Sequence, residues 1–527
     1  MKVLERIRAA TERAPFKSIA YVILPLAAIP RLWQMIFDQG VFWPDEIFQT
    51  LEQAHRLAFG YGWTPWEFRD GARSWAFAGI LGLVLKLASF VGLTKSGIGV
   101  VMTVRTVMLA LALAGVHATM RIGERVGGSL GALLAGTSVA VCPALIVYGT
   151  RCMTEMASGP LLAIAAMLVL EGTWKRAWFA ALLASLSIFF RYQNGMFALT
   201  LFVYLFFNRH WKASLMYALG GLLGGALGGL LDKLTWGHFF HSFLVYWKFN
   251  YVEGQAARWG VDAFDYYFET IHRSFGPAMW ILIVGFVLSF RKQRILPLLC
   301  IGNLLVHAKI PHKEFRFLMP MVPLALGLAG GGLGWALGGL LRAPSDANDD
   351  GAKPLGRFQR LRALTGGWVA TGLAISLGVL LARKAQTITF ADMGQFRLGR
   401  EDGWAPWNHE AGPNYAYWEA GRHDDLCGII TIGTPLISAG GYSYLHKNVP
   451  MYGSLSQFDL SGANYIAAPR LMPPPLGYSL VKSFTLPVRD FARSDGRMWP
   501  GPTYDYVLFR RDGACAAPPP WWSATFP

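Results

Sequence analysis

Two charged stretches of the sequence carry side chains suited to group transfer at a membrane surface. The first begins at Trp43 and reads WPDEIFQTLEQAH. Pro44 favours the first position of a helix, so the carboxylates of Asp45 and Glu46 fall in the first turn, where the helix dipole favours anions. The second, HAKIPHKEFRFLMP at 307–320, places several cations at the end of an apolar segment. A carboxylate can take the proton of an acceptor hydroxyl, and Lys or Arg can hold a phosphate leaving group. Helix capping and attraction to lipid phosphates are the simpler explanations of these stretches.

The composition indicates an integral membrane protein. Of the 527 residues, 53% are hydrophobic and only 15% are charged, and the mean hydropathy is +0.34; a soluble protein carries about a quarter charged residues. Much of the +16 net charge lies in short connectors between apolar segments, as cytoplasmic loops of membrane proteins do. No zinc-finger pattern, heptad repeat or RNA-binding fingerprint occurs, so we expect membrane lipids and not nucleic acid as partners.

Twelve apolar segments follow a basic N-terminus that should stay cytoplasmic. If the segment 75–93 lies in the interface or re-enters, the other eleven cross the membrane in a consistent phase. The basic connectors are then cytoplasmic: 120–128, 172–176, 208–212, 291–294 and 342–365. The opposite segments are extracytoplasmic: 38–97, 149–156, 191–194, 232–275, 309–316 and the chain from 383. These outward segments hold almost every unusual polar cluster, so we expect them to converge on one site.

The stretch 44–59 predicts a short amphipathic helix lying on the membrane. Its apolar stripe contains Ile47, Phe48, Leu51, Ala54 and Ala58, whereas Glu52, Gln53 and Arg56 are expected to face away from it. Three charged residues fall within apolar segments and are either functional or reach the interface with their long side chains: Arg31, Lys86 and Arg105. The Gly-rich runs 220–229 and 329–340 carry small residues four apart, a spacing that lets helices pack closely in lipid.

We expect two domains, a transmembrane module at 1–382 and an extracytoplasmic domain at 383–527. Strand-like stretches such as GIITIG and YDYVLF predict a mixed α/β or β-rich fold for the second domain. Cys427 and Cys515 lie in it and could pair if it faces an oxidising compartment.

Several motifs resemble the family 22, GT-C type mannosyltransferases, which act in the assembly of N-glycan precursors and GPI anchors. WPDEIFQTLEQAH is similar to the family's HPDE motif in the first outer loop, with Trp43 in place of His. GYGWTPWEFRDGARSW is similar to its downstream YG…TWEW…RS stretch, with Pro65 inserted. IPHKEFRFLMP is similar to its HKE-x-RF motif and is the most specific match. YGTRCMTEMAS and YSYLHKNVPMY are weaker matches, and the resemblance runs from about residue 40 to 450.

The resemblance implies a multi-pass α-helical GT-C fold and an inverting transfer of mannose. The donor would be a polyprenyl- or dolichyl-phosphate-linked mannose, and the acceptor a hydroxyl of a glycolipid or glycan on the extracytoplasmic side. Enzymes of this type resemble metal-independent ones and the outer loops hold no Asp-x-Asp pair, so we expect neither a metal nor another cofactor. The lack of N-x-[ST] sequons favours a bacterial inner membrane over the endoplasmic reticulum.

Motif positions assign expected roles to individual residues. Asp45 would be the general base, and Glu46 would assist it or bind the acceptor. Four residues would hold the donor phosphate or orient its ligands: His312, Lys313, Glu314 and Arg316. Six further residues are candidates for binding the sugar or the acceptor: Trp66, Glu67, Arg73, Arg151, Glu155 and Arg191.

Two alternatives remain open at this point. A related GT-C transferase could carry another lipid-linked sugar such as arabinose, glucose or galactose, since nothing in the sequence distinguishes C2 epimers. A transporter or flippase of an anionic lipid would instead predict charges deep within spans and repeated halves. The sequence shows few such charges and no internal repeat.

Overall fold

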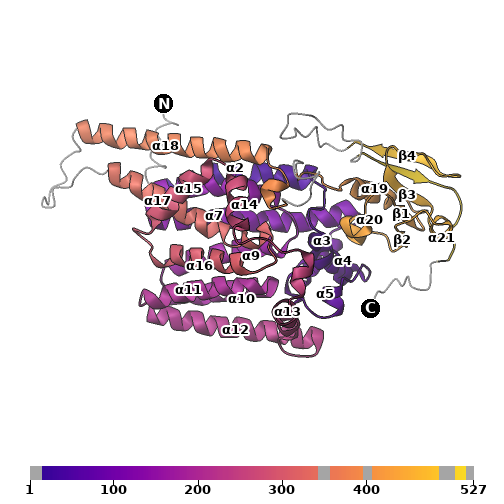
Figure 1. Cartoon of the computed structure of the whole chain (residues 1–527), viewed down its shortest axis with the longest axis horizontal. Coiled ribbons are helices and arrows are strands. Elements are labelled where there is room, and N and C mark those ends of the chain that lie inside the picture. The colour runs from indigo at the N-terminus through magenta and orange to yellow at the C-terminus, as the bar shows by residue number, and fades with distance from the viewer. Residues whose placement is uncertain (1–14, 342–356, 396–405, 486–504, 518–527) are drawn as a thin grey trace.

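In the computed structural model, the described residues are 15–341, 357–395, 406–485 and 505–517. The predicted connector 342–365 therefore lies partly outside the described residues. Long helices run side by side through most of the molecule, and a small sheet lies at one end (Figure 1). The bundle comprises α2 Pro15–Phe37, α7 Gly97–Ala140, α9 Thr154–Leu170, α10 Trp174–Phe190, α11 Gly195–Phe207, α12 Trp211–Trp236, α15 Ala278–Ser289, α16 Ile295–Lys309, α17 Val322–Leu341 and α18 Arg357–Gln386.

Close helix packing follows the Gly-rich runs, as predicted. Along α12, Gly220, Gly224 and Gly228 face α10, where an added Cβ would collide with Trp178, Ser185 or Phe189. Gly331 of α17 lies as closely against α7. The backbone of α7 departs from helical geometry at Gly127 and Gly128, and Gly128 adopts a positive φ of 67°. This bend falls within the connector predicted at 120–128.

Judged by length and hydropathy alone, three helices among the described residues are long and apolar enough to cross a membrane: α2, α7 and α12. The pair α14 Tyr266–Phe275 and α15 would make a fourth, although the two helices are bent by 114°. Five shorter apolar helices lie beside them, α6 Ala76–Phe90 among them. The membrane class is confirmed, and the number of eleven crossings stays a prediction.

The predicted interfacial helix forms as three consecutive pieces: α3 Pro44–Glu46, the π-helical η1 Ile47–Leu51 and α4 Glu52–Phe59. Its whole apolar stripe is buried. The expectation that Glu52 and Gln53 face away was wrong, because both are fully buried. The Glu52 carboxylate accepts hydrogen bonds from the backbone N–H groups of Trp63, Tyr442 and Ser443, so the C-terminal region covers this face of α4.

Short helices connect the long ones. They are α5 Trp66–Arg69, α8 Pro143–Val147, η2 Tyr192–Asn194, α13 His241–Trp247, η3 Lys248–Val252, η4 Gln255–Trp259, η5 Phe315–Leu318 and η6 Ala391–Met393. The predicted outward segments meet through them. Thr50 donates a hydrogen bond to the carbonyl of Cys152, Trp66 stacks near Phe249, and Trp236 donates to the carbonyl of Arg73. The expected convergence of these segments is thus present.

The C-terminal region contains a five-stranded sheet of order β2-β1-β3-β5-β4. Its strands are β1 Ile429–Thr431, β2 Met451–Tyr452, β3 Tyr465–Pro469, β4 Ser479–Phe484 and β5 Tyr506–Arg510. The pairs β1–β2 and β1–β3 are parallel, and β3–β5 and β4–β5 are antiparallel. Helices α19 Gly412–Ala420, η8 Leu436–Ser438, α20 Gly441–Leu445 and α21 Gln457–Gly462 accompany it. The expected mixed α/β region is confirmed, and Cys427 and Cys515 form a disulfide.

The division between the two expected domains is less sharp than the sequence suggests. Helix α18 continues to Gln386, past the predicted boundary at 382. One hydrophobic cluster includes Leu51 of η1, Val101 of α7 and Tyr465 of β3. The C-terminal region therefore shares a core with the loops over which it lies, and the two-domain division stays a prediction.

Two buried arginines in the bundle have structural partners. The guanidinium of Arg31 donates to the carbonyls of Val139 and Ala140 at the end of α7. Arg105 donates to the carbonyls of Met35 and Asp38 at the end of α2. Each satisfies helix-terminal carbonyls that have no partner within the helix. Lys86 of α6 reaches the carbonyl of Ala58 at 3.4 Å, which joins α6 to the interfacial helix.

Candidate active site

The two motif stretches meet through one ion pair. Nη2 of Arg316 lies 2.6 Å from the carboxylate of Asp45, and Nε lies 2.5 Å from Glu314 and 3.6 Å from Glu155. Asp45 is the second residue of α3 and lies at the edge of the cluster with 32% of its side chain exposed, whereas the Arg316 side chain is 6% exposed. The site therefore offers one accessible carboxylate beside a buried guanidinium.

Glu314 and His312 form the inner side of this cluster. His312 Nε2 lies 3.0 Å from Glu314, and Nδ1 lies 3.1 Å from the carbonyl of Gly260. Burial alone would raise the pKa of Glu314, but Arg316 and the hydrogen bond from His312 lower it to about 2. Burial would lower the pKa of His312, but its hydrogen bond and charge interaction with Glu314 raise it. Glu314 is thus held as an anion that contacts both His312 and Arg316.

Arg191 and Glu155 extend the cluster toward η2. Arg191 Nη1 lies 2.5 Å from Glu155, and both side chains are at most 5% exposed. The Arg191 guanidinium also lies over the ring of Phe317, 4.1 Å from its centroid. Both predicted residues therefore join the same charged network as Arg316.

Arg151 and Glu46 form a second, separate ion pair. Arg151 Nη1 lies 3.0 Å from Glu46, and Nη2 lies 2.5 Å from Asp38; the side chains of Arg151 and Asp38 are completely buried. Glu46 also accepts hydrogen bonds from the backbone of Phe42 and Trp43. No substrate can touch Arg151 in this arrangement, so its expected role in sugar or acceptor binding does not fit the geometry. Glu46 is buried as well, so of the two neighbouring acids Asp45 and Glu46 only Asp45 is accessible.

The predicted sugar-binding residues lie in the same charged region. Glu67 accepts a hydrogen bond of 2.6 Å from the side-chain amide of Gln49. Burial raises the pKa of Glu67, Arg73 lowers it and Asp45 raises it, so these charges act on one another. Within the described part of the chain, Arg73 has neither a hydrogen-bond nor an ion-pair partner for its guanidinium. The Trp66 ring lies 4.5 Å from Phe249 and 6.1 Å from Trp259, forming an aromatic wall.

Lys313 contacts the outer loop 232–275 and not the Asp45 cluster. Its ammonium donates 2.7 Å to the carbonyl of Asp262 and 3.4 Å to that of Pro311. These contacts hold the outer loop 232–275 against the His-Lys-Glu stretch. In this arrangement Lys313 fixes the loop and does not face the Asp45 carboxylate.

Sequence reasoning missed three contributors. Asp38, which is the second acid on Arg151, carries no motif signal. Tyr148 is completely buried, and the charges of Arg316, Glu314 and Glu155 act on its hydroxyl. The ring of Trp43 lies 5.0 Å from the Arg316 guanidinium, so this departure from the family's His packs on the phosphate-binding candidate. Tyr148 opens the motif YGTRCMTEMAS, which was the one available signal for it.

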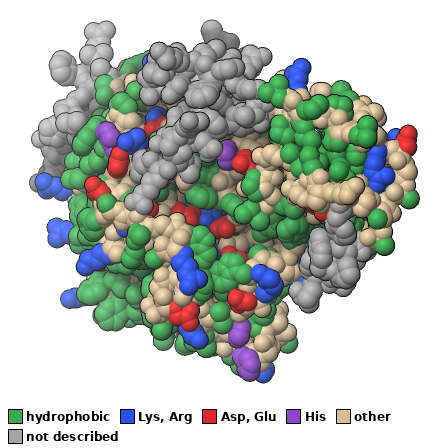
Figure 2. Space-filling view, turned by 45° about the vertical axis from the view of Figure 1, so that its right-hand side comes forward, with side chains coloured by type: hydrophobic (Ala, Val, Ile, Leu, Met, Phe, Trp, Pro, Cys, Tyr) green, Lys and Arg blue, Asp and Glu red, His purple; other side chains and the backbone are tan. Residues whose placement is uncertain are grey.

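The face that carries the outer loops mixes acids, bases and apolar surface. Figure 2 shows Asp and Glu side chains beside Lys and Arg side chains among extensive hydrophobic areas. Such a surface suits an amphiphilic substrate with a charged head and an apolar tail. Among the described residues no group of three or more His, Cys, Asp or Glu is placed to hold a metal ion.

Comparisons with known proteins agree with the motifs. The profile of the Alg9-like mannosyltransferase family matches residues 22–399, which is more than half of the chain. A GPI mannosyltransferase 3 of Yarrowia lipolytica is 27% identical over 323 residues, covering 59% of this chain and 62% of the relative. A GPI alpha-1,2-mannosyltransferase 3 of Danio rerio is 25% identical, covering 56% of each chain. The matches thus span about three fifths of the length of these relatives.

A solved structure has the same fold over nearly the whole chain. ArnT from Cupriavidus metallidurans, bound to undecaprenyl phosphate, aligns with a TM-score of 0.54 at 14% identity. The alignment covers 97% of this chain and all of ArnT. At this identity the likeness concerns the fold alone, which is of the predicted GT-C type.

Proposed function

The chain belongs to the Alg9-like mannosyltransferase family, and we propose that it transfers mannose from a polyprenyl- or dolichyl-phosphate-linked donor to an acceptor hydroxyl. The acceptor would be a glycolipid or a glycan. The observation that carries this proposal is the 2.6 Å contact between Asp45 and Arg316, because it joins the two motifs that the chemistry needs. One supplies a base, and the other supplies a cation for phosphate.

The reaction proposed is a single displacement at the anomeric carbon. The acceptor hydroxyl gives its proton to the Asp45 carboxylate while its oxygen forms a bond to C1 of the sugar. The bond between C1 and the phosphate oxygen breaks on the opposite face, and the electron pair leaves with the lipid phosphate. The anomeric configuration is therefore inverted. Arg316 stabilises the negative charge that grows on the phosphate.

The roles of the other residues follow from their contacts. His312 and Glu314 fix the orientation of Arg316, and Glu155 with Arg191 closes the same network. Arg73 lies near Glu67, and its guanidinium has no hydrogen-bond or ion-pair partner among the described residues. Arg73 is therefore a second candidate for binding the donor phosphate or the sugar. Trp66 offers an aromatic face on which a sugar ring can pack. Arg151, Glu46 and Lys313 position the loops that carry these groups.

We place the reaction on the extracytoplasmic side of a bacterial cytoplasmic membrane. The disulfide between Cys427 and Cys515 supports an oxidising environment for the C-terminal region, which covers the interfacial helix. The absence of N-x-[ST] sequons supports the bacterial location. Cysteine accessibility in sealed cells tests the sidedness: single cysteines placed at 120–128 and at 309–316 should be labelled from opposite sides.

The function is tested with purified protein in liposomes. Polyprenyl-phosphate-mannose and a panel of glycolipid acceptors should yield a mannosylated product, whereas nucleotide-linked mannose should yield none. Transfer of a different sugar from the same lipid carrier would support the assignment as a glycosyltransferase but contradict the assignment of mannose as the sugar. Movement of the lipid between leaflets without any glycosylated product would contradict the proposal and favour a flippase.

A further inference from the structure

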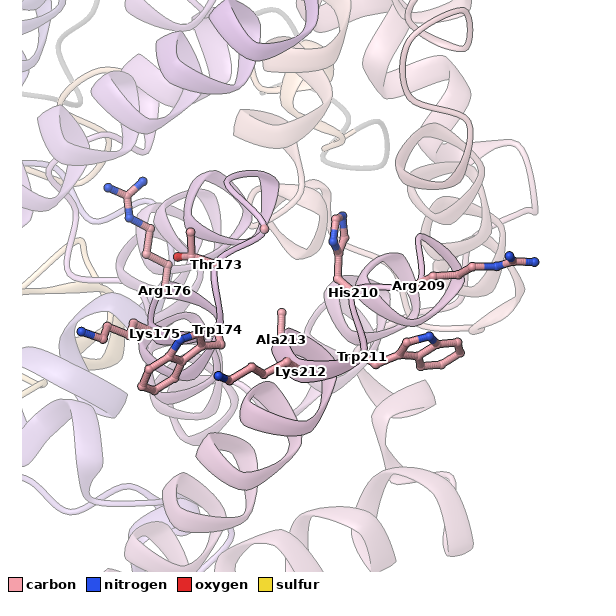
Figure 3. Close-up of a pocket in the computed structure, with 10 residues that line it drawn as sticks. Thr173, Trp174, Lys175, Arg176, Arg209, His210, Trp211, Lys212 and Ala213 are labelled. Atoms are coloured by element: carbon pink, nitrogen blue, oxygen red, sulfur yellow. The ribbon is translucent and has the colours of Figure 1, made fainter.

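A cavity lies at the end of the bundle opposite the Asp45 cluster. It has a volume of about 750 Å³ and is lined by the connectors 172–176 and 209–213 (Figure 3). These connectors precede α10 and α12, whose far ends lead to Arg191 and Trp236 of the outer loops. Since α10 has 17 residues, about 25 Å of helix separates the cavity from those loops. The cavity therefore does not belong to the site described above.

The electrostatics of this cavity favour an anion. Both helices begin at its edge, each helix N-terminus carries a partial positive charge, and neither helix has an acid in its first turn. The first turns instead hold Lys175, Arg176 and Lys212. Arg176 pairs with Glu171. Within the described chain, Lys175 and Lys212 have no carboxylate partner, so this positive charge is not balanced by the protein.

The ring of Trp174 lies near both unbalanced cations. The ammonium groups of Lys175 and Lys212 lie 5.5 Å and 5.0 Å from the centroid of the Trp174 ring. Lys212 thereby reaches across from α12 to α10. Figure 3 shows Thr173, His210 and Lys212 at the edges of the gap, whereas Lys175, Arg176, Arg209 and Trp211 point away from it. Donors from two connectors thus surround one space.

The residues around the cavity favour a lipid, rather than a soluble anion, as its ligand. Trp174 and Trp211 are 39% and 56% exposed, and aromatic side chains of this kind concentrate at membrane interfaces. An exposed apolar row continues along α12 from the cavity: Leu215, Leu219 and Leu222 are 60%, 45% and 70% exposed. A headgroup in the cavity would leave its acyl chains against this row.

We propose that this cavity binds the phosphate headgroup of an anionic phospholipid in the cytoplasmic leaflet. Lys212 binds the phosphate oxygens, and Lys175 adds positive charge from the far side of the Trp174 ring. Thr173 and His210 add hydrogen bonds, and the leucine row of α12 packs against the acyl chains. This site is independent of the proposed sugar transfer, because it uses none of the residues assigned to the reaction.

The test compares lipid retention by the purified full-length protein, measured by native mass spectrometry after titration with phosphatidylglycerol or phosphatidylcholine. The wild type should retain phosphatidylglycerol in preference to phosphatidylcholine. The double variant Lys175→Gln/Lys212→Gln should reduce that preference on the order of tenfold, because each lysine near the membrane surface strengthens binding of an anionic lipid. Lys212→Arg, which keeps the charge, should retain it.

The matched control removes two cations from the connector 291–294 on the same predicted face. Arg291→Gln/Lys292→Gln should leave the preference within about twofold. All of these side chains are exposed, so the substitutions should not disturb folding. An unchanged elution profile and unfolding temperature verify this. Equal loss in the control, or no loss in the Lys175/Lys212 variant, would overturn the site and leave only general attraction to basic connectors. If soluble glycerol 1-phosphate displaces the lipid at equal concentration, the site takes a free phosphate and the lipid assignment fails.

Discussion

The carboxylate of Asp45 lies 2.6 Å from Nη2 of Arg316, although 271 residues separate them in the chain. The contact holds the expected base against the expected ligand of the leaving phosphate. A donor phosphate competes with Asp45 for the guanidinium, since both offer anionic oxygens to the same nitrogen. Binding of the donor would therefore loosen Asp45 at the moment when it must accept a proton.

Arg316→Lys tests whether the guanidinium geometry matters. Arg316 contacts Asp45 through Nη2 and contacts both Glu314 and Glu155 through Nε, and the compact ammonium group of Lys cannot reproduce that fork. We expect kcat to fall by about 10²-fold, in the range seen when one charge-stabilising donor is lost. Steady-state transfer of radiolabelled mannose measures it. A variant with wild-type kcat would show that Arg316 does not act on the leaving group.

Arg151→Met tests the assignment of the second ion pair to folding. It leaves Asp38 and Glu46 buried without a counter-charge, so the free energy of unfolding should drop by about 3–5 kcal/mol. Thermal unfolding in detergent measures the loss. The matched control is Arg69→Met, an exposed arginine in the same outer loop, which should change stability by less than about 0.5 kcal/mol. Equal stability of both variants would contradict the assignment.

The histidine pair between α4 and α20 predicts acid sensitivity of the C-terminal contact. His55 Nε2 lies 2.9 Å from His446 Nδ1. Burial, and then the charge of His446, lowers the pKa of His55 to about 3. Since the unfolded chain has a value near 6.5, the stabilisation is full above about pH 6.5 and is lost as the pH falls toward 3.

The loss should approach about 1.4 kcal/mol per pH unit within that window, since one proton is taken up on unfolding. Unfolding temperatures measured between pH 4.5 and 7.5 report it. His55→Gln should flatten the profile, and the exposed His272→Gln should leave it unchanged. A wild-type profile that stays flat over this range would disprove the assignment.

The disulfide predicts a stability difference between oxidised and reduced protein. Cys427 and Cys515 close a loop with a sequence separation of 88, and loss of such a crosslink costs about 4 kcal/mol in the chain-entropy account. Cys427→Ser/Cys515→Ser should therefore unfold at lower temperature, with the difference removed when both proteins are reduced. Maleimide labelling of these cysteines in unreduced protein from intact cells would contradict the pairing.

The sequence motifs correctly indicated which loops meet, but not which acid is available. The motif resemblance assigns the base to Asp45 and a second role to Glu46, but local spacing cannot show which of these neighbouring acids is accessible. The fold separates them, because Arg151 takes Asp38 and Glu46 while Arg316 takes Asp45. These partners lie more than 100 residues away, so no local pattern encodes the choice.

The error at Glu52 has the same origin. Helical periodicity places Glu52 opposite the apolar stripe of α4, which is the solvent face of an isolated amphipathic helix. Its hydrogen-bond partners Tyr442 and Ser443 lie 390 and 391 residues further along the chain. A polar residue under a covering domain cannot be told from a solvated one by its position on the helix. Four accepted hydrogen bonds explain why an acid is tolerated there.

The most direct test of the account is single-turnover mannose transfer by Asp45→Asn. The variant should bind polyprenyl-phosphate-mannose at least as tightly as the wild type, because the carboxylate that competes for Arg316 is gone, while the rate of transfer falls by about 10²–10⁴-fold because the base is lost. Asp70→Asn, an exposed acid of the same loop, should transfer at the wild-type rate. Transfer by Asp45→Asn at the wild-type rate would contradict the assignment of Asp45 as the base and, with it, the proposed mechanism.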